Sequence, residues 1–342
     1  MTASHICCNH RRLSISIRAR KAHRPPSFIT SPRHTADRGR ARPPVSPRVR
    51  RSVMEFSSAW ALFQLVDPLL PTGGFAHSVG LEPATLAGVT LHDDADGVDD
   101  VERFAARAGQ HAIDSAVPFV LASRECVETA MTTASTSSTP TAGCATPAPP
   151  WLDAWVALNR EFTALSAGNH VASRASASTG SALLRAAHTS FAADDTIGAL
   201  SAIRDARRFS ADAAPPHVAP VFGAIAAVLR LDRLTTVRTF VYLVLRDACS
   251  AATRLNASGP LETSAALRRL ARFAEPACAS ALRRHDLHAK PRTVDKDGTD
   301  AHTTTTMRRT ALRAVAYAAS SALVIDAVQG AHDDAPARLF SS

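Results

Sequence analysis

Apolar residues recur at helical spacing through the second half of the chain, and this spacing limits the possible folds more than any other feature. Five of them fall on one face of a single helix: Val218, Val221, Phe222, Ile225 and Leu229. The pattern repeats over residues 237–255 for about five turns, too long for a buried strand, and Gly259-Pro260 supplies a stop signal. No strand–turn–strand pattern is evident. The sequence therefore predicts an all-α fold of about eight to ten helices in a single domain.

Further helices are predicted on both sides of this region. Asp99 or Asp100 can cap a helix over residues 101–112, and Pro118 is expected to kink or end it. Residues 312–323 form another amphipathic stretch. Aromatic residues make up only 5% of the chain, so the core must consist mainly of Ala, Val and Leu.

Basic charge is concentrated at the N-terminus. Residues 1–53 hold 13 of the 39 Lys and Arg residues and one of the 30 Asp and Glu residues. This composition fits an organellar transit peptide, a disordered arm that binds anionic partners, or an upstream extension before a start at Met54. We therefore divide the chain into a basic, disordered extension over residues 1–53 and an all-α domain over residues 54–342. The arm supports one alternative function, nucleic-acid binding, which predicts steeply salt-dependent association.

Two polar stretches inside the domain look like low-complexity insertions. Residues 129–150 are rich in Thr, Ser, Pro and Ala, and residues 284–306 end in four threonines. Neither has enough large apolar residues to bury, so both are expected to be exposed loops.

The sequence gives little indication of a metal site or of a membrane-spanning segment. The six cysteines form no C-x-x-C pair, which argues against a zinc site. His285 and His288 lie three apart, but a designed metal site is not expected in a polar insertion. No apolar run reaches the roughly 18 residues that a membrane span needs. We expect no cofactor, metal, membrane or nucleic-acid partner for the domain, and a cytoplasmic location unless residues 1–53 direct it to an organelle.

Residues 71–82, which read PTGGFAHSVGLE, contain the most distinctive local sequence. The paired glycines permit a tight turn, but they do not belong to a phosphate-binding loop, and Ser78 is not in a G-x-S-x-G elbow. A rival hypothesis is a stand-alone hydrolase that uses His77 and Ser78. Neighbouring side chains point in different directions, however, so these two do not form a nucleophile–base pair by themselves. We expect no catalytic residues.

The same residues resemble a known family. Residues 71–82 match P-x-G-G-F-x-H-S-x-G-L-E, the opening signature of the urease accessory protein F (UreF) family, at every fixed position. Three later segments are similar to the family's and come in the same order: NHVASRAS at 169–176 followed by GSALLR at 180–185, HVAPVFG at 217–223, and ARLFSS at 337–342. The resemblance spans roughly residues 59–342 without the two insertions.

The resemblance implies an all-α homodimer that is not an enzyme. Family members bind the D/H-type urease accessory protein through a helical surface and the C-terminal tail, and together the two proteins recruit the G-type GTPase. The assembly passes Ni²⁺ to apo-urease. A modulating effect on the GTPase is also implied.

Two groups of partner-binding residues are carried over from the resemblance. The tail would dock on the D/H-type protein, with Phe340 as the apolar anchor and Arg338 as a polar clamp, next to Leu339 and Ser342. The second group would shape the dimer or the GTPase-facing surface: Pro71, Gly73, Gly74, Phe75, His77, Ser78, Gly80, Glu82, His217, Pro220 and Gly223. The alternatives are a frayed tail, and glycines and prolines that serve only turns and packing.

Overall fold

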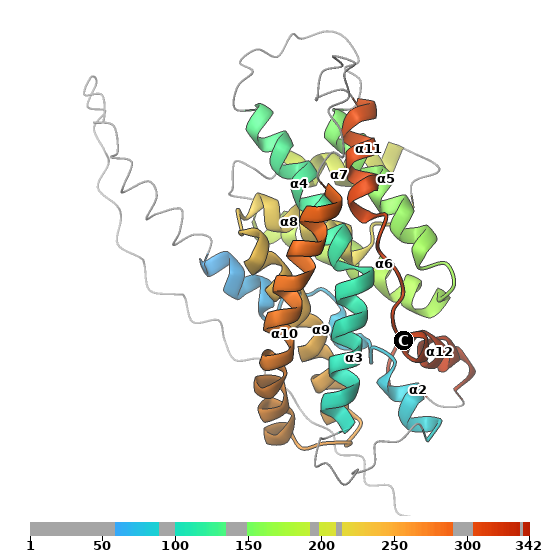
Figure 1. Ribbon diagram of the computed structural model, residues 1–342. Helices are drawn as coiled ribbons and strands as arrows, with labels where there is room; N and C mark the ends of the chain where they lie inside the picture. The colour runs from blue at the N-terminus through green and yellow to red at the C-terminus, as the bar shows by residue number, and fades with distance from the viewer. Residues whose placement is uncertain are drawn as a thin grey trace, which may run out of the picture. The chain divides into compact units, whose positions relative to one another are not determined.

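Helix α8 (Val218–Val228) lies at the centre of the fold, because its side chains are apolar on every face. All its residues from Ala219 to Val228 are buried, and Pro220 stands in the first turn, where no backbone donor is lost. The computed structural model describes residues 59–88, 100–134, 149–191, 198–209, 214–289, 304–335 and 338–342. In it, α8 packs mainly against α4 (Val117–Ala134) and α6 (His170–Ser190) (Figure 1).

The other helices surround this centre. Helices α3 (Asp100–Ser115), α9 (Arg233–Arg254) and α10 (Pro260–Ala289) pack on one another, and α5 (Pro150–Leu165) packs on α11 (Thr304–Val315) (Figure 1). The remaining segments are the helix over residues 59–66, η1 (Gly74–Ala76), α2 (Leu81–Leu86), α7 (Gly198–Phe209), α12 (Leu323–Gly330) and η2 (Ala331–Asp334). The described residues contain no strand, which confirms the all-α class, and they contain more helical segments than expected.

The core is built as the composition predicts, mainly from Ala, Val and Leu, with a few well-placed rings. Phe119 meets Phe162 edge-on with ring centroids 5.0 Å apart, and Phe222 meets Phe240 at 5.3 Å. Such edge-to-face contacts stabilise a core beyond the area that they bury.

Two glycines allow the backbones around α8 to touch. A Cβ atom at Gly223 would lie 2.2 Å from the carbonyl oxygen of Val120 in α4. A Cβ atom at Gly180 in α6 would lie 2.2 Å from the carbonyl oxygen of Pro216. Gly223 therefore allows α4 of the same chain to approach α8 closely.

Three expectations about element boundaries were wrong. Helix α4 continues to Ala134, into the expected insertion 129–150, because Met131 packs against the core. Helix α10 continues to Ala289, into the insertion 284–306, and His285 on it is fully buried. The expected stretch over residues 312–323 is two helices, since α11 ends at Val315 and α12 begins at Leu323. The far ends of both insertions are also helical, since α5 begins at Pro150 and α11 at Thr304, and residues 135–148 and 290–303 lie outside the described residues.

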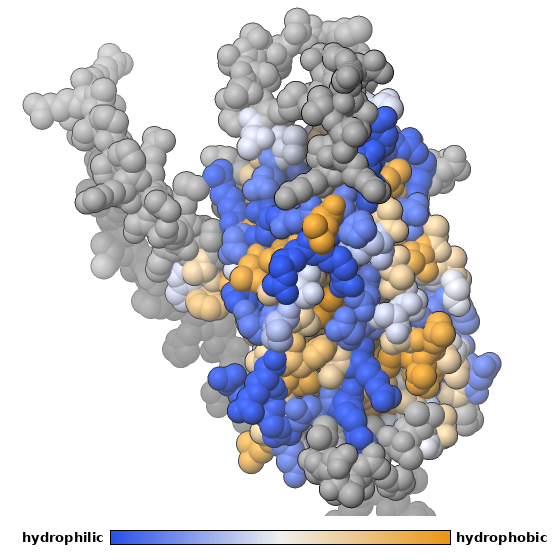
Figure 2. All heavy atoms as spheres, viewed as in Figure 1, coloured by the Kyte–Doolittle hydropathy of each residue, from blue (hydrophilic) through white to orange (hydrophobic). Residues whose placement is uncertain are grey.

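Hydrophilic residues dominate the face over α3 and α10, and a hydrophobic patch lies over α12 (Figure 2). Leu323 and Val324 are exposed on this last helix. None of the helices in the described ranges is both long and apolar enough to cross a membrane. The basic extension, residues 1–53, lies outside the described residues.

Replacing Gly180 by Ala should destabilise the protein, because the new methyl group would meet backbone atoms that cannot rotate away. We expect the Gly180→Ala variant to lose about 1–3 kcal/mol of unfolding free energy, the usual cost of overpacking. Urea unfolding followed by circular dichroism measures it. The matched control is Gly198→Ala in α7, where nothing lies within 4 Å of the added atom. Equal stability of the two variants would contradict the close approach.

Candidate functional site

The last residues of the chain, 338–342, lie against the loop formed by residues 71–82. Ser341 donates its amide to the carbonyl oxygen of Ala76 at 2.8 Å. Ser78 donates both its amide, at 2.7 Å, and its hydroxyl, at 3.0 Å, to the main-chain oxygen of Ser342. His77 Nδ1 lies 2.6 Å from the hydroxyl oxygen of Ser342. The tail is therefore not frayed; it is an ordered part of the domain and ends beside α2 and α12 (Figure 1).

The shape of the 71–82 loop depends on backbone angles that favour glycine. Gly73 and Gly80 have φ values of +79° and +90°, and they precede η1 and α2 respectively. A Cβ atom at Gly80 would also lie 2.7 Å from Gln329 of α12. The expected tight turn at Gly73 and Gly74 is confirmed. Pro71 and Gly74 line the adjoining cavity.

Glu82 holds the tail from inside the protein. Its side chain stands in the first turn of α2 and is buried. The carboxylate accepts the amide of Leu339 through Oε1 and that of Phe340 through Oε2, the latter at 3.2 Å. A buried carboxylate is costly unless it is paired or hydrogen-bonded, so these amides stabilise both partners.

Phe340 anchors the tail to its own chain, which differs from its expected role as an anchor on a partner. Its ring is only 6% exposed and packs with Leu81, Val101, Ala251 and Ala252. The guanidinium of Arg254 lies 4.2 Å from the centre of the Phe340 ring and 3.8 Å from that of Phe75. Arg254 therefore joins the tail to the 71–82 loop through two cation–π contacts.

Arg338 is held by a cluster centred on Asp333 of η2. Asp333 pairs with Arg338 at 3.1 Å, with Arg174 of α6 at 2.8 Å and with His170 at 3.2 Å. The hydrogen bonds from Arg174 hold the pKa of the Asp333 carboxyl well below its usual range. The polar clamp expected of Arg338 thus fixes the tail to the domain itself.

His77 and Ser78 do not form the nucleophile–base pair of the hydrolase hypothesis. Each bonds to Ser342 instead. Burial lowers the pKa of His77, with smaller contributions from His332 and Arg174, so the imidazole stays neutral near pH 7.

His217, Pro220 and Gly223 are buried in the core and do not form a surface. His217 Nε2 lies 3.0 Å from the hydroxyl of Thr163, and its Nδ1 lies 3.2 Å from that of Ser176. Pro220 contributes its carbonyl oxygen, which accepts from Ser123 and Trp155. Burial lowers the pKa of His217 to about 4. These residues serve packing.

A mostly apolar cavity of about 640 Å³ adjoins the 71–82 loop. Helices α6, α8 and α9 form its other walls, and Ser342 also lines it. Asp247 of α9 reaches the loop, since a Cβ atom at Gly74 would meet its Oδ2 at 2.9 Å. Burial raises the pKa of the Asp247 carboxyl against the opposing effect of Arg246.

Several residues of this site are not evident in the sequence. Arg174, Arg254, His332 and Asp333 all hold the tail, directly or through a carboxylate. Two signals were available: Arg174 belongs to the family-like segment 169–176, and His332 and Asp333 stand shortly before the tail. Arg174 and Arg254 lie on helices. The apolar pattern predicts which face of each helix is buried, but it does not predict which segments the two arginines contact.

No group of three or more His, Cys, Asp or Glu within the described ranges is arranged to hold a metal ion. His285 Nε2 instead lies 3.1 Å from the Glu125 carboxylate. His288 stacks on Tyr317 with ring centroids 4.4 Å apart. The two histidines therefore face different partners.

Comparison with known proteins gives consistent matches. The family model described as UreF matches residues 97–271, just over half of the chain. Urease accessory protein F of Oryza sativa subsp. indica is 31% identical over 224 residues, which cover 65% of this chain and 72% of that protein. Urease accessory protein F of Arabidopsis thaliana is 32% identical over 212 residues, which cover 62% and 75%. The 71–82 loop and the tail lie outside the range that the family model matches.

The lowered pKa of His217 makes a testable contribution to stability. Because the folded protein holds His217 neutral, this contribution is fully present above the ordinary pKa of about 6.5 and is lost as the pH falls through about 4. The difference in unfolding free energy between the wild type and His217→Gln should therefore shrink as the pH is lowered from about 6.5 to about 4. Urea titrations at a series of pH values measure it. A difference that stays constant with pH would contradict the neutral, buried state.

Proposed function

Because this chain belongs to the urease accessory protein F family, we propose that it is a non-catalytic scaffold in urease maturation. In this role it binds the D/H-type accessory protein, and together they recruit the G-type GTPase for nickel transfer to apo-urease. Modulation of the GTPase is part of the same proposal. The observation that carries it is the surface that the docked tail and the 71–82 loop form together.

This composite surface, defined by Phe75, Arg338 and Leu339, has the chemistry of a protein-binding patch. Phe75 is 68% exposed and Leu339 is 66% exposed, although both residues are large and apolar. The Arg338 side chain is also partly exposed beside them in the tail, where Asp333 holds it. Aromatic and Arg side chains surrounded by packed neighbours are typical binding hot spots.

The tail backbone is ordered in the protein alone, before any partner binds to the composite surface. Glu82, Ala76 and Ser78 fix the tail's main chain, and Phe340 is buried beneath it. Binding of a partner therefore needs little further ordering of the tail, so the entropic cost of association is small. This supports docking of the D/H-type protein on the tail while Phe340 keeps its place in the domain.

The state of His77 and Ser78 supports a scaffold over a hydrolase. Both side chains hydrogen-bond to Ser342, and these bonds fix the tail. A nucleophile needs an adjacent base with an orienting partner, and the bonds of these two residues are directed elsewhere.

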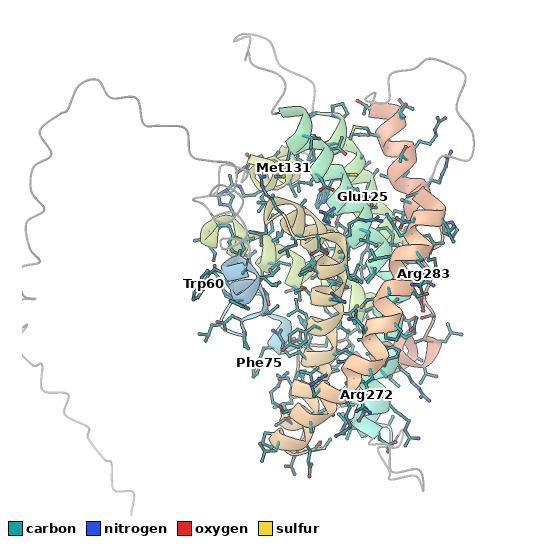
Figure 3. All side chains as sticks on the ribbon, turned by 60° about the vertical axis from the view of Figure 1, so that its left-hand side comes forward. Trp60, Phe75, Glu125, Met131, Arg272 and Arg283 are labelled. Carbon is teal, nitrogen blue, oxygen red and sulfur yellow. The ribbon has the colours of Figure 1, made fainter. Side chains whose placement is uncertain are left out.

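The helix over residues 59–66 supports a homodimer. Trp60 and Phe63 are 60% and 61% exposed, and their rings meet edge-on at 6.1 Å. Leu69 is exposed after the same helix. Trp60 and Phe75 lie along the same side of the described domain, away from Arg272 and Arg283 of α10 (Figure 3). Adjoining exposed rings of this size mark an interaction site, and we assign it to a second copy of the chain.

Removing the apolar side chains of the composite surface should weaken partner binding without unfolding the protein. We expect Phe75→Ser combined with Leu339→Ser to lower the affinity for the D/H-type accessory protein by about tenfold or more, as expected for two hot-spot residues. Biolayer interferometry with the purified partner measures it. The control is Leu261→Ser, which removes an even more exposed leucine from α10. Unchanged affinity in the double variant would refute this docking surface.

Polar substitution of the exposed rings should abolish the dimer. Trp60→Ser with Phe63→Ser should shift the molar mass in light scattering after size exclusion from that of a dimer to that of a monomer, because the apolar contact area is lost. Leu287→Ser, on the exposed side of α10, serves as the control. A wild-type protein that is monomeric at high concentration would contradict the proposed dimer.

A further inference from the structure

The cavity beside the 71–82 loop has the size of a small-molecule site. Its volume of about 640 Å³ falls within the range of roughly 300–1,000 Å³ that is usual for ligand pockets. Most of its lining is apolar. Water is a poor occupant of such a space, because a buried water needs about two to four polar partners. An apolar molecule suits it better, since its apolar surface leaves water on binding.

The wall that α9 contributes changes from apolar to polar along the helix. Phe240, Leu243, Val244, Asp247 and Ser250 all line the cavity. They are three or four positions apart and so form one stripe, which is about 15 Å long at the helical rise per residue. The three apolar residues come first, and the carboxylate and the hydroxyl follow at the end nearer the 71–82 loop. A molecule that lies along this stripe needs an apolar body and one polar end.

The apolar end of the cavity belongs to the rigid centre of the fold. Phe222 of α8 lines it and meets the Phe240 ring at 5.3 Å. Leu183 of α6 and Val218 of α8 also line it. Both of these helices are held by the backbone contacts at Gly180 and Gly223 described above. The shape of this end is therefore fixed before any ligand binds, which lowers the cost of binding.

Asp247 provides an acceptor at the polar end. Its Oδ1 accepts two hydrogen bonds from Arg246, one from Nε at 2.9 Å and one from Nη2 at 2.7 Å. Its Oδ2 accepts none from the described residues. Burial raises the pKa of this carboxyl, so its charged form lacks part of the solvation that water would give. A hydrogen-bond donor on a ligand would compensate this loss at Oδ2.

The charges around Asp247 favour a neutral donor over a cation. Arg246 already pairs with the carboxylate, and it acts to lower the pKa of Asp247, as Arg254 does to a smaller extent. An ammonium group at Oδ2 would bring a third positive charge into a partly buried site. A hydroxyl or a neutral N–H group makes the same hydrogen bond without this repulsion.

We propose that this cavity binds a small, neutral, amphipathic molecule. Its apolar body lies against Phe222, Phe240 and Val244, and its single O–H or N–H group donates to Oδ2 of Asp247. The site concerns the protein alone and does not rest on the proposed function.

A matched pair of probes tests the site in the full chain. Indole has an apolar ring system and one N–H donor, and indene has the same shape with a CH2 group in place of the N–H. Titrations followed by methyl NMR measure both affinities through the wall residues Leu183, Leu243 and Val244, with the buried Leu270 of α10 as the reference. We expect indole to bind about tenfold or more tightly than indene, as expected for one hydrogen bond to a charged acceptor.

Two variants locate the binding. Asp247→Asn should remove the preference for indole, because the amide gives its oxygen to Arg246 and turns its NH2 group to the cavity. The control is Asp205→Asn in α7, which also follows its arginine partner in the sequence but does not line the cavity. Ala175→Phe places a ring in the cavity from α6 and should abolish the binding of both probes.

Equal affinities of indole and indene for the wild type would overturn the proposal, even if a variant failed to fold. Shifts that spare the three wall residues would overturn it as well, since the probe would then bind elsewhere. Binding of indole to Trp60→Ser with Phe63→Ser but not to the wild type would also refute it, because a second copy would then fill the cavity.

Discussion

Two direct backbone contacts fix the core on which the rest of the structure is built. At Gly223 the central helix α8 touches α4, and at Gly180 helix α6 touches the segment that enters α8. His217 reinforces the second contact, because its ring bonds to hydroxyl groups of α5 and α6. Packing at this distance leaves no room for adjustment, so the helices are held in one arrangement. Helix α9, which packs next to this centre, thereby receives a defined position.

The tail site follows from that position. Helix α9 presents Ala251 and Ala252, which receive the Phe340 ring, and Arg254, which lies between Phe340 and Phe75. Helix α6 presents Arg174 to Asp333. The buried carboxylate of Glu82 then joins α2 to the tail, since the amides of Leu339 and Phe340 compensate its charge, and it also contacts His332 of η2 at 3.3 Å. Residues of the proposed composite surface are thus held by other residues of the same domain.

Local features of the site could be predicted from the sequence, and its long-range contacts could not. Helices α8 and α9 and the turn at Gly73 follow from apolar spacing and backbone preferences, which act between near neighbours. Phe340 was predicted to anchor a partner because nothing in a single sequence shows that Leu81 and Ala252 form a pocket for it. His285 was placed in an exposed loop for the same reason, since its partner Glu125 comes from α4. The partner-binding roles remain predictions.

The bonds of Glu82 also bear on how the chain acquires its structure during synthesis. The amides that compensate this carboxylate lie 257 and 258 positions later in the sequence. Helix α2 leaves the ribosome long before them, so its acidic side chain must stay hydrated until residues 339 and 340 are made. The 71–82 loop consequently reaches its final form among the last parts of the domain, although it is made among the first. A nascent chain that stops short of residue 339 would leave the Glu82 carboxylate without the two amides that compensate its charge.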